Sequence, residues 1–136
     1  MTIALADTNL FLRALVNDHE HHQKAIAIFD KARSKQIRLV WPSVIFVEVI
    51  HALKASKFYH LDRTEIAALL TPYLKLPGLR LEEPEVTERA LSIFAGTKLD
   101  IADAWLIAKA QQGKVKQIYS FDKDFKNVHG IEWIEP

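Results

Sequence analysis

Near its N-terminus the chain reads TIALADTNLFLRALV, residues 2–16, in which an apolar run passes directly into a helical pattern. Residues 2–6 have the length and character of a buried strand, and Asp7 ends it. Thr8 or Asn9 can cap the helix that follows at once, because side-chain oxygens of this kind accept hydrogen bonds from the first helical turn. This stretch therefore predicts a strand joined to a helix with Asp7 at the junction.

The same alternation of strand and helix patterns continues through the rest of the chain. Further strands are expected at residues 37–41, 79–81, 117–120 and 131–134, and helices at about 20–34, 44–56, 62–74, 84–96 and 100–113. Ser43 and Asp100 are suited to be N-caps, and Asp62 with Glu65 forms a capping box. Strands that alternate with helices predict an α/β fold with helices on both faces of a parallel sheet.

Length and composition narrow the class of protein. A chain of 136 residues has room for one compact domain, so we expect residues 1–136 to form a single domain. Hydrophobic residues make up 49% of the chain, which excludes a disordered segment. Without cysteine the chain forms no disulfide, zinc–thiolate site or iron–sulfur cluster. The net charge of +1 excludes a strongly basic protein that coats nucleic acid.

The sequence also carries no sign of a membrane or export segment. The N-terminus lacks a basic leader, and the longest apolar stretch, residues 44–50, contains Glu48. That stretch is far shorter than the ~20 residues that span a bilayer. We therefore expect a cytoplasmic protein without membrane association.

Four acidic residues either follow a predicted strand or lie among apolar residues of a predicted helix, where a carboxylate is a candidate for a functional role. Asp7 and Asp122 each follow a predicted strand, so their carboxylates are expected at the rim where sites form in open α/β sheets; a helix cap or a turn is the alternative for each. Glu48 is surrounded by apolar residues on its helix and is expected to be buried, unless it forms a salt bridge or lies at the helix edge. Asp103 shares the apolar stripe of its helix, or acts as the capping-box partner of Asp100.

Carboxylates distributed over four elements, in a chain without cysteine, suggest one chemistry. Their oxygens are hard ligands that suit Mg²⁺ or Mn²⁺. Clustered carboxylates repel one another, and a divalent cation relieves that repulsion and positions a water for attack on a phosphodiester. From the residues alone the interpretation stops at an α/β domain with an acidic metal site.

The motifs around these acids resemble those of a known family. They are LADTN at residues 5–9, FVEV at 46–49, DIADA at 100–104 and SFDKDF at 120–125. In this order and spacing the whole chain resembles the PIN-domain ribonucleases, and in particular the short VapC-type toxins of bacterial toxin–antitoxin pairs. The resemblance implies a three-layer α/β/α sandwich on a central, mainly parallel sheet.

The resemblance also implies a function and a set of site residues. The activity would be Mg²⁺- or Mn²⁺-dependent hydrolysis of RNA, with a four-acid site made of Asp7, Glu48, Asp103 and Asp122. Asp7 and Asp103 would bind the metal directly, and Asp100 ranks below Asp103. Supporting residues would be Thr8 and Asn9, of which Asn9 orients the Asp7 carboxylate or a water, and Ser120, which stands where many relatives have threonine. The implied partners are a small antitoxin and a second copy of the chain.

Several weaker signals have two interpretations. Arg13, Lys54 and Lys57 are candidates for binding RNA, or cations of solvated helix faces. The histidines of HEHH, residues 19–22, could bind metal, but an exposed start of a helix suits them better. Residues 44–59 carry more apolar side chains than one sheet covers, which favours a partner surface.

Competing functions remain at this stage. A housekeeping RNA-processing PIN nuclease would share the same site, and an inactive PIN-fold binding module would share the fold. A receiver-like or aspartate-based phosphatase domain would need a phosphoacceptor aspartate with a partner lysine, and Asp7 with Lys123 fits that pattern poorly.

Overall fold

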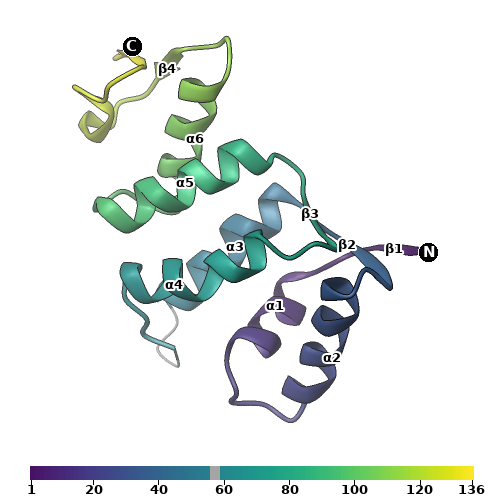
Figure 1. The fold of residues 1–136 in the computed structure, drawn as a ribbon. Coiled ribbons are helices and arrows are strands. Elements are labelled where there is room, and N and C mark those ends of the chain that lie inside the picture. Colours follow the sequence, from purple (N-terminus) through teal and green to yellow (C-terminus); the bar gives the residue numbers. More distant parts are fainter. Residues whose placement is uncertain (56–58) are drawn as a thin grey trace. The chain divides into compact units, whose positions relative to one another are not determined.

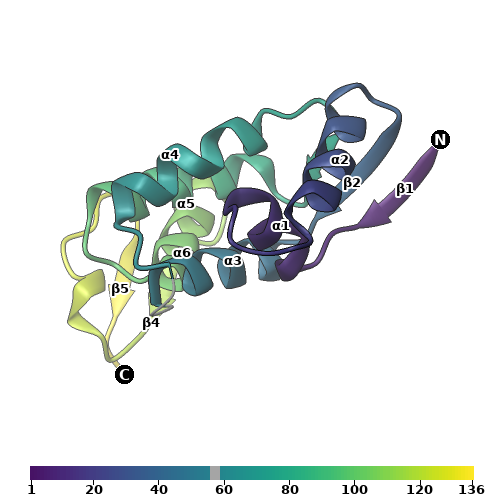
Figure 2. The same ribbon diagram turned by 90° about the horizontal axis from the view of Figure 1, so that it is seen from below.

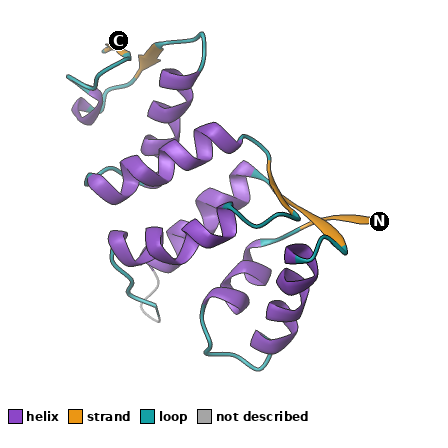
Figure 3. Cartoon of the chain, in the orientation of Figure 1, coloured by secondary structure: helices purple, strands orange, loops and turns teal. Residues whose placement is uncertain are grey.

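The fold is described from a computed structural model, which describes residues 1–55 and 59–136. The chain divides into two compact units, residues 1–84 and 85–136, and each is described by itself. Strands and helices alternate along the sequence (Figures 1 and 3). The first unit holds β1 (Thr2–Leu5), α1 (Thr8–Leu15), α2 (His22–Arg33), β2 (Ile37–Trp41), α3 (Ser43–Ala55), α4 (Arg63–Leu74) and β3 (Leu79–Leu81).

The three strands of the first unit form one parallel sheet in the order β1-β2-β3. Ala4 pairs with Leu39, and Leu39 pairs in turn with Leu79. Two helices connect each strand to the next, as parallel pairing requires a long crossover. The carboxyl ends of all three strands therefore lie at the same edge of this sheet.

Aromatic side chains from four elements form the centre of the first unit. Phe11 of α1 stacks on Trp41 of β2, with ring centroids 4.0 Å apart, and also contacts Phe29 of α2 at 5.1 Å. Phe46 of α3 meets the other side of the group, 5.4 Å from Trp41. All four rings are essentially inaccessible to solvent. Packed aromatic rings contribute about 0.5–1.5 kcal/mol per pair beyond the area that they bury.

The strand predicted at residues 2–6 exists, but the prediction that it is buried is wrong. Every residue of β1 is exposed, with Ile3 at 63% and Leu5 at 75% of full accessibility. The cause is its place at one end of the strand order, where it projects from the edge of the first unit (Figure 2). The apolar pattern predicts the strand itself, but burial depends on neighbours that the pattern does not reveal.

The second unit combines two helices with a two-stranded parallel sheet. It contains α5 (Pro84–Gly96), α6 (Ile101–Gln112), β4 (Gln117–Tyr119), the 3₁₀ turn η1 (Lys123–Phe125) and β5 (Glu132–Ile134). Ile118 of β4 pairs with Trp133 of β5. The core is a cluster of Ile107, Ala110, Ile118 and Phe125. This cluster packs α6 against the strands, and so sets where the acids that flank them lie.

Local signals in the sequence explain most element boundaries. Asp62 and Glu65 form the predicted capping box at the start of α4. The helix predicted at about residues 84–96 is α5, and Gly96 is its last helical residue. Every strand pair is parallel and helices connect the strands, which confirms the predicted α/β class. Among residues 1–55 and 59–136, none of the helices combines the length and apolar character that a membrane span requires.

Gly78, in the turn before β3, allows two backbone segments to approach closely. A Cβ at this position would collide with the carbonyl oxygen of Ala32 and lie 2.7 Å from that of Ile37. Both obstacles are backbone atoms, which cannot move without disturbing α2 and β2. We therefore predict that Gly78→Ala lowers the free energy of unfolding by about 1–3 kcal/mol in urea titrations.

Gly96→Ala is the matched control, because apart from its chain neighbours and the backbone of its own helix no described atom lies within 4 Å of the added Cβ. It should change the free energy of unfolding by less than about 0.5 kcal/mol, or raise it slightly, since alanine favours a helix. Equal effects of the two substitutions would contradict the packing argument.

Candidate functional site

Asp7 lies at the carboxyl end of β1 and caps α1. Its Oδ1 accepts a hydrogen bond of 2.9 Å from the backbone N–H of Leu10. The structure corrects the prediction that Thr8 or Asn9 is the cap, since α1 begins at Thr8 itself. The cap holds the carboxylate in place, and Asp7 is exposed at the rim of the sheet. An ionised carboxylate has about four acceptor positions, so capping leaves others for a ligand.

Two hydroxyl groups at the same edge are buried without a hydrogen-bond partner. They are Thr8 Oγ1, beside Asp7, and Ser43 Oγ, at the start of α3 directly after β2; neither finds a partner among the described residues. The N–H of Ala6 donates to the carbonyl of Val40, so the ends of β1 and β2 are adjacent. Orphaned polar groups are rare in proteins and often indicate a missing ligand. They show that this edge is suited to a polar ligand.

Glu82 is an acid that the sequence analysis missed. It follows β3 directly, and its Oε1 accepts a hydrogen bond of 3.2 Å from the N–H of Ser43. It therefore satisfies one of the free N–H groups at the start of α3. The signal that could have found it is the one used for Asp7 and Asp122, an acid placed directly after a strand.

Glu48 is exposed on α3, so the prediction that it is buried is wrong. The buried face of α3 consists of Phe46, Val49, Ile50 and Leu53, all fully inaccessible. Glu48 instead lies one turn beyond Val44, which is 71% exposed. Apolar residues occupy more of the surface of α3 than its buried face. For this reason the apolar neighbours of Glu48 in the sequence do not predict its burial. The carboxylate thus needs no buried partner and is accessible to a ligand.

The second unit brings the remaining acids near one another. Burial is the main cause of a raised pKa at Asp103, and the negative charges of Asp100, Asp122 and Asp124 raise this pKa further. These groups come from the start of α6 and from the turn after β4. Carboxylates that raise one another's pKa are destabilised by their mutual repulsion, and a hard divalent cation relieves it. Carboxylate oxygens of this kind are ligands that Mg²⁺ and Mn²⁺ prefer.

The turn after β4 holds Asp122 through its own hydrogen bonds. Asp122 Oδ1 accepts from the N–H of Asp124 at 2.9 Å, and the N–H of Asp122 donates to Ser120 Oγ at 2.9 Å. The indole of Trp133 donates to the carbonyl of Ser120. Asp100 Oδ1 accepts from the N–H of Ala102 and caps α6. The cap-or-turn alternative is therefore realised at Asp7 and Asp122, and Asp100 is the N-cap that was predicted for its helix. All three residues remain exposed.

The residues are thus located separately in the two units. Asp7, Thr8, Asn9 and Glu48 belong to the first, and Asp100, Asp103, Ser120 and Asp122 to the second. Within either unit, no three histidine or acidic side chains among the described residues gather closely enough to hold a metal ion. A four-acid site therefore stays a prediction.

The cations and histidines singled out from the sequence have different environments. Arg13 is half-buried; its guanidinium donates to Tyr59 Oη at 3.2 Å and lies 4.0 Å from Asp18. Lys54 is exposed in the last turn of α3, and Lys57 lies outside the described residues. His22 opens α2, as predicted for a helix start, and its Nδ1 donates to the carbonyl of Arg13.

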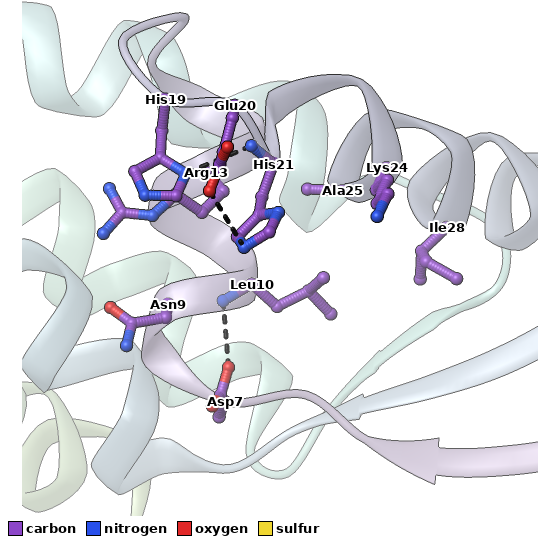
Figure 4. Close-up of a pocket in the computed structure, with 10 residues that line it drawn as sticks. All are labelled: Asp7, Asn9, Leu10, Arg13, His19, Glu20, His21, Lys24, Ala25 and Ile28. Atoms are coloured by element: carbon purple, nitrogen blue, oxygen red, sulfur yellow. Dashed lines mark hydrogen bonds and ion pairs between the residues drawn. The ribbon is translucent and has the colours of Figure 1, made fainter.

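A pocket of about 510 Å³ opens beside Asp7 (Figure 4). Its walls come from Asp7, from α1, from the loop at residues 19–21 and from α2. Asp7 and Asn9, two residues of the predicted site, belong to its lining, as does Arg13. The pocket is therefore continuous with the rim at which Asp7 stands.

Comparison with known proteins relates the chain to a domain family and to a ribonuclease. The family model of the PIN domain matches residues 4–131, which span both units. Ribonuclease VapC37 of Mycobacterium tuberculosis (strain ATCC 25618 / H37Rv) is 28% identical over 142 aligned residues, which cover 97% of this chain and 96% of that protein.

The acids of the second unit lead to a prediction for pH dependence. We expect Asp100→Asn to lower the pKa of Asp103 in NMR titrations without metal, since asparagine keeps the cap and removes a negative charge. The pKa should stay above its usual range, because burial is the larger cause. Glu88→Gln, on an exposed acid of α5, is the control and should leave this pKa where it is.

The sign of the stability effect follows from the same shift. A carboxyl whose pKa is raised in the folded state binds its proton more tightly there than in the unfolded chain. The contribution of Asp103 to the free energy of unfolding is therefore most favourable at pH values below the ordinary aspartate pKa of about 4. This contribution declines as the pH rises through the raised pKa of the folded state. Asp103→Asn should remove this decline in metal-free melting curves, and an unchanged pH profile would contradict the assignment.

Proposed function

The chain belongs to the PIN domain family, and on this premise we propose that it is a metal-dependent endoribonuclease acting as the toxin of a type II toxin–antitoxin pair. Membership confirms the predicted fold class, an α/β/α sandwich on a mainly parallel sheet. The observation that carries the proposal is the match over residues 4–131, which includes all four predicted acids. The similarity to a ribonuclease over 97% of the chain supports RNA as the substrate.

In this proposal Asp7, Glu48, Asp103 and Asp122 serve one site. Asp7 and Asp103 are the direct ligands of the cation, and Glu48 and Asp122 complete the acidic surroundings. Mg²⁺ or Mn²⁺ would supply the activation of a water and the stabilisation of negative charge on the phosphate. The accessible carboxylates of Asp7, Glu48 and Asp122, and the repulsion felt at Asp103, support this assignment.

The other residues position these acids. Capping holds the Asp7 carboxylate at the end of β1. Asn9, two residues later in the first turn of α1, would orient this carboxylate or a water. Ser120 fixes the turn that carries Asp122 through its hydroxyl group. Asp100 keeps the first turn of α6 in place and adds negative charge near Asp103.

We propose an antitoxin and a second copy of the chain as protein partners. Part of the range 44–59, for which an apolar surplus was predicted, lies outside the described residues. In the described part, Phe46, Val49, Ile50 and Leu53 are buried, so the surplus there is largely absorbed within the chain. Support comes instead from exposed apolar side chains of β1 and from Val44. Apolar surface of this kind favours association.

Substitutions of Asp7 separate its role as a cap from its role in the site. Asp7→Asn should retain the stability of the metal-free protein, because asparagine caps a helix as well as aspartate does. Asp7→Ala should lower the free energy of unfolding by about 1 kcal/mol. Both should reduce the rise in melting temperature caused by Mn²⁺, since a lost ligand weakens binding to the folded state. Both should lower the rate of RNA cleavage by at least about 100-fold.

Asp62→Asn provides the matched control. Asp62 caps α4 as Asp7 caps α1, so the chemical change is the same at a cap outside the proposed site. This variant should keep wild-type cleavage and, on induced expression, should arrest growth, whereas Asp7→Asn should not. Cleavage that survives in Asp7→Asn would contradict the site, and cleavage without growth arrest would favour the housekeeping nuclease.

Association is tested by light scattering. The purified chain should scatter as a dimer at tens of micromolar, and Ile3→Lys with Leu5→Lys should weaken the dimer because they place charge on the exposed apolar strand. Val115→Lys, at a residue of the second unit that is also 75% exposed, is the control. A monomeric wild-type protein would contradict the proposed dimer.

A further inference from the structure

The pocket beside Asp7 has a floor and a rim of different chemistry. Leu10 of α1 with Ala25 and Ile28 of α2 gives an apolar floor, and Asn9, Arg13, His19, His21 and Lys24 supply polar groups around it (Figure 4). Its volume of about 510 Å³ lies within the ~300–1,000 Å³ that is usual for small-ligand sites. A pocket with an apolar floor and convergent polar groups is suited to a flat ring that carries polar edges.

The rim is held in place by hydrogen bonds within the first unit. His19 Nδ1 accepts from the N–H of His21 at 3.1 Å, and the two imidazole rings lie 4.8 Å apart. His22 Nδ1 donates to the carbonyl of Arg13 at 2.7 Å and so ties the loop to α1. Because Arg13 is held by Tyr59 and Asp18, its guanidinium is also fixed. A rim fixed in this way loses little freedom when a ligand binds.

The pocket is lined by two cationic and two acidic side chains. Arg13 and Lys24 are the cations, and Asp7 and Glu20 are the acids. Glu20 is directed to His21, with 4.0 Å between Oε1 and Nε2, and Asp7 binds the N–H of Leu10. Lys24 lies on the α2 side of the floor, next to Ala25 and one turn before Ile28. This arrangement offers a cation for one phosphate beside an apolar surface for one base.

We propose that this pocket binds one nucleotide of the RNA, adjacent to the phosphodiester that is cut, with the base against Leu10, Ile28 and the His21 ring and a backbone phosphate on Lys24. Unstacked bases of single-stranded RNA stack on aromatic side chains, histidine included, and expose edges to groups such as the Asn9 amide. The inference rests on the proposed function, because the position next to the cut follows from Asp7, which lines the pocket. A protein segment is the rival occupant.

Two variants test the proposal without disturbing the core. His21→Ala removes the ring and Lys24→Ala removes the cation, and both side chains are exposed. Lys31→Ala, an exposed cation of α2 outside the pocket, and His129→Ala, an exposed histidine of the second unit, are the matched controls. All four variants should melt as the wild-type protein does, which melting curves check.

The first measurement is binding of a fluorescein-labelled ten-nucleotide RNA of mixed sequence, by anisotropy in EDTA. We expect His21→Ala to weaken binding about tenfold, in the range found for the loss of one stacked base. Lys24→Ala should weaken binding by a similar factor, about tenfold at low salt, because it removes one phosphate contact. The controls should bind as the wild type does. Unchanged RNA affinity in both pocket variants overturns the proposal, and this is also the result expected if a protein segment occupies the pocket.

The second measurement separates this inference from the proposed function. Hydrolysis of RNA is compared with hydrolysis of bis(p-nitrophenyl) phosphate, a small diester without a neighbouring nucleotide, in Mn²⁺. The ratio of the two kcat/KM values should fall about tenfold in the pocket variants and stay at the wild-type value in the controls. If the wild type cleaves RNA and the ratio is unaltered in the pocket variants, nucleotide binding in the pocket is overturned and the nuclease activity is not. If the pocket variants weaken RNA binding but the wild type does not cleave RNA, the nuclease activity is overturned and RNA binding in the pocket is not.

Discussion

The stack of Phe11 on Trp41 is the contact on which the geometry of the first unit depends. It fixes α1 to β2, and the neighbouring contacts with Phe29 and Phe46 extend the same group to α2 and α3. Phe11 follows Asp7 by one helical turn, so the stack also sets where that carboxylate stands. The helices that build the pocket and carry Glu48 are therefore positioned by one buried aromatic group. A large ring replaced by a small side chain here would disturb the rim as well as the stability of the unit.

Most of the candidate acids serve the fold and the proposed site together. Asp7, Asp100 and Asp122 each accept a backbone N–H and begin a helix or turn. Capping places a carboxylate at the end of a helix that starts near the end of a strand, which is where sites form in parallel sheets. The two roles are compatible because a cap uses one acceptor position among several. Burial is the main cause of the raised pKa of Asp103, and the repulsion of the neighbouring carboxylates, which raises it further, is the cost of this concentration of charge.

The sequence predicted the positions of all helices and strands well, because apolar periodicity and capping residues are local signals. It predicted burial less well. β1 and Glu48 both lie in apolar surroundings along the chain, yet both are exposed, since burial depends on neighbours that are distant in sequence. The acids after β1 and β4 were identified, whereas Glu82 after β3 was missed although the signal was the same. Whether the four acids share one metal cannot follow from local patterns, because they belong to separate elements.

The net charge of +1 makes the distribution of cations decisive for an anionic substrate. An acidic site repels RNA unless positive groups lie nearby, since phosphate contacts supply most of the affinity for nucleic acid. Beside Asp7 those groups are Arg13 and Lys24, and they differ in kind. Arg13 is tied to Tyr59 and Asp18 and mainly shapes the rim, whereas Lys24 is an exposed side chain on α2. The cation best placed to attract an RNA strand toward Asp7 is therefore Lys24 on α2, and not a residue next to the acids themselves.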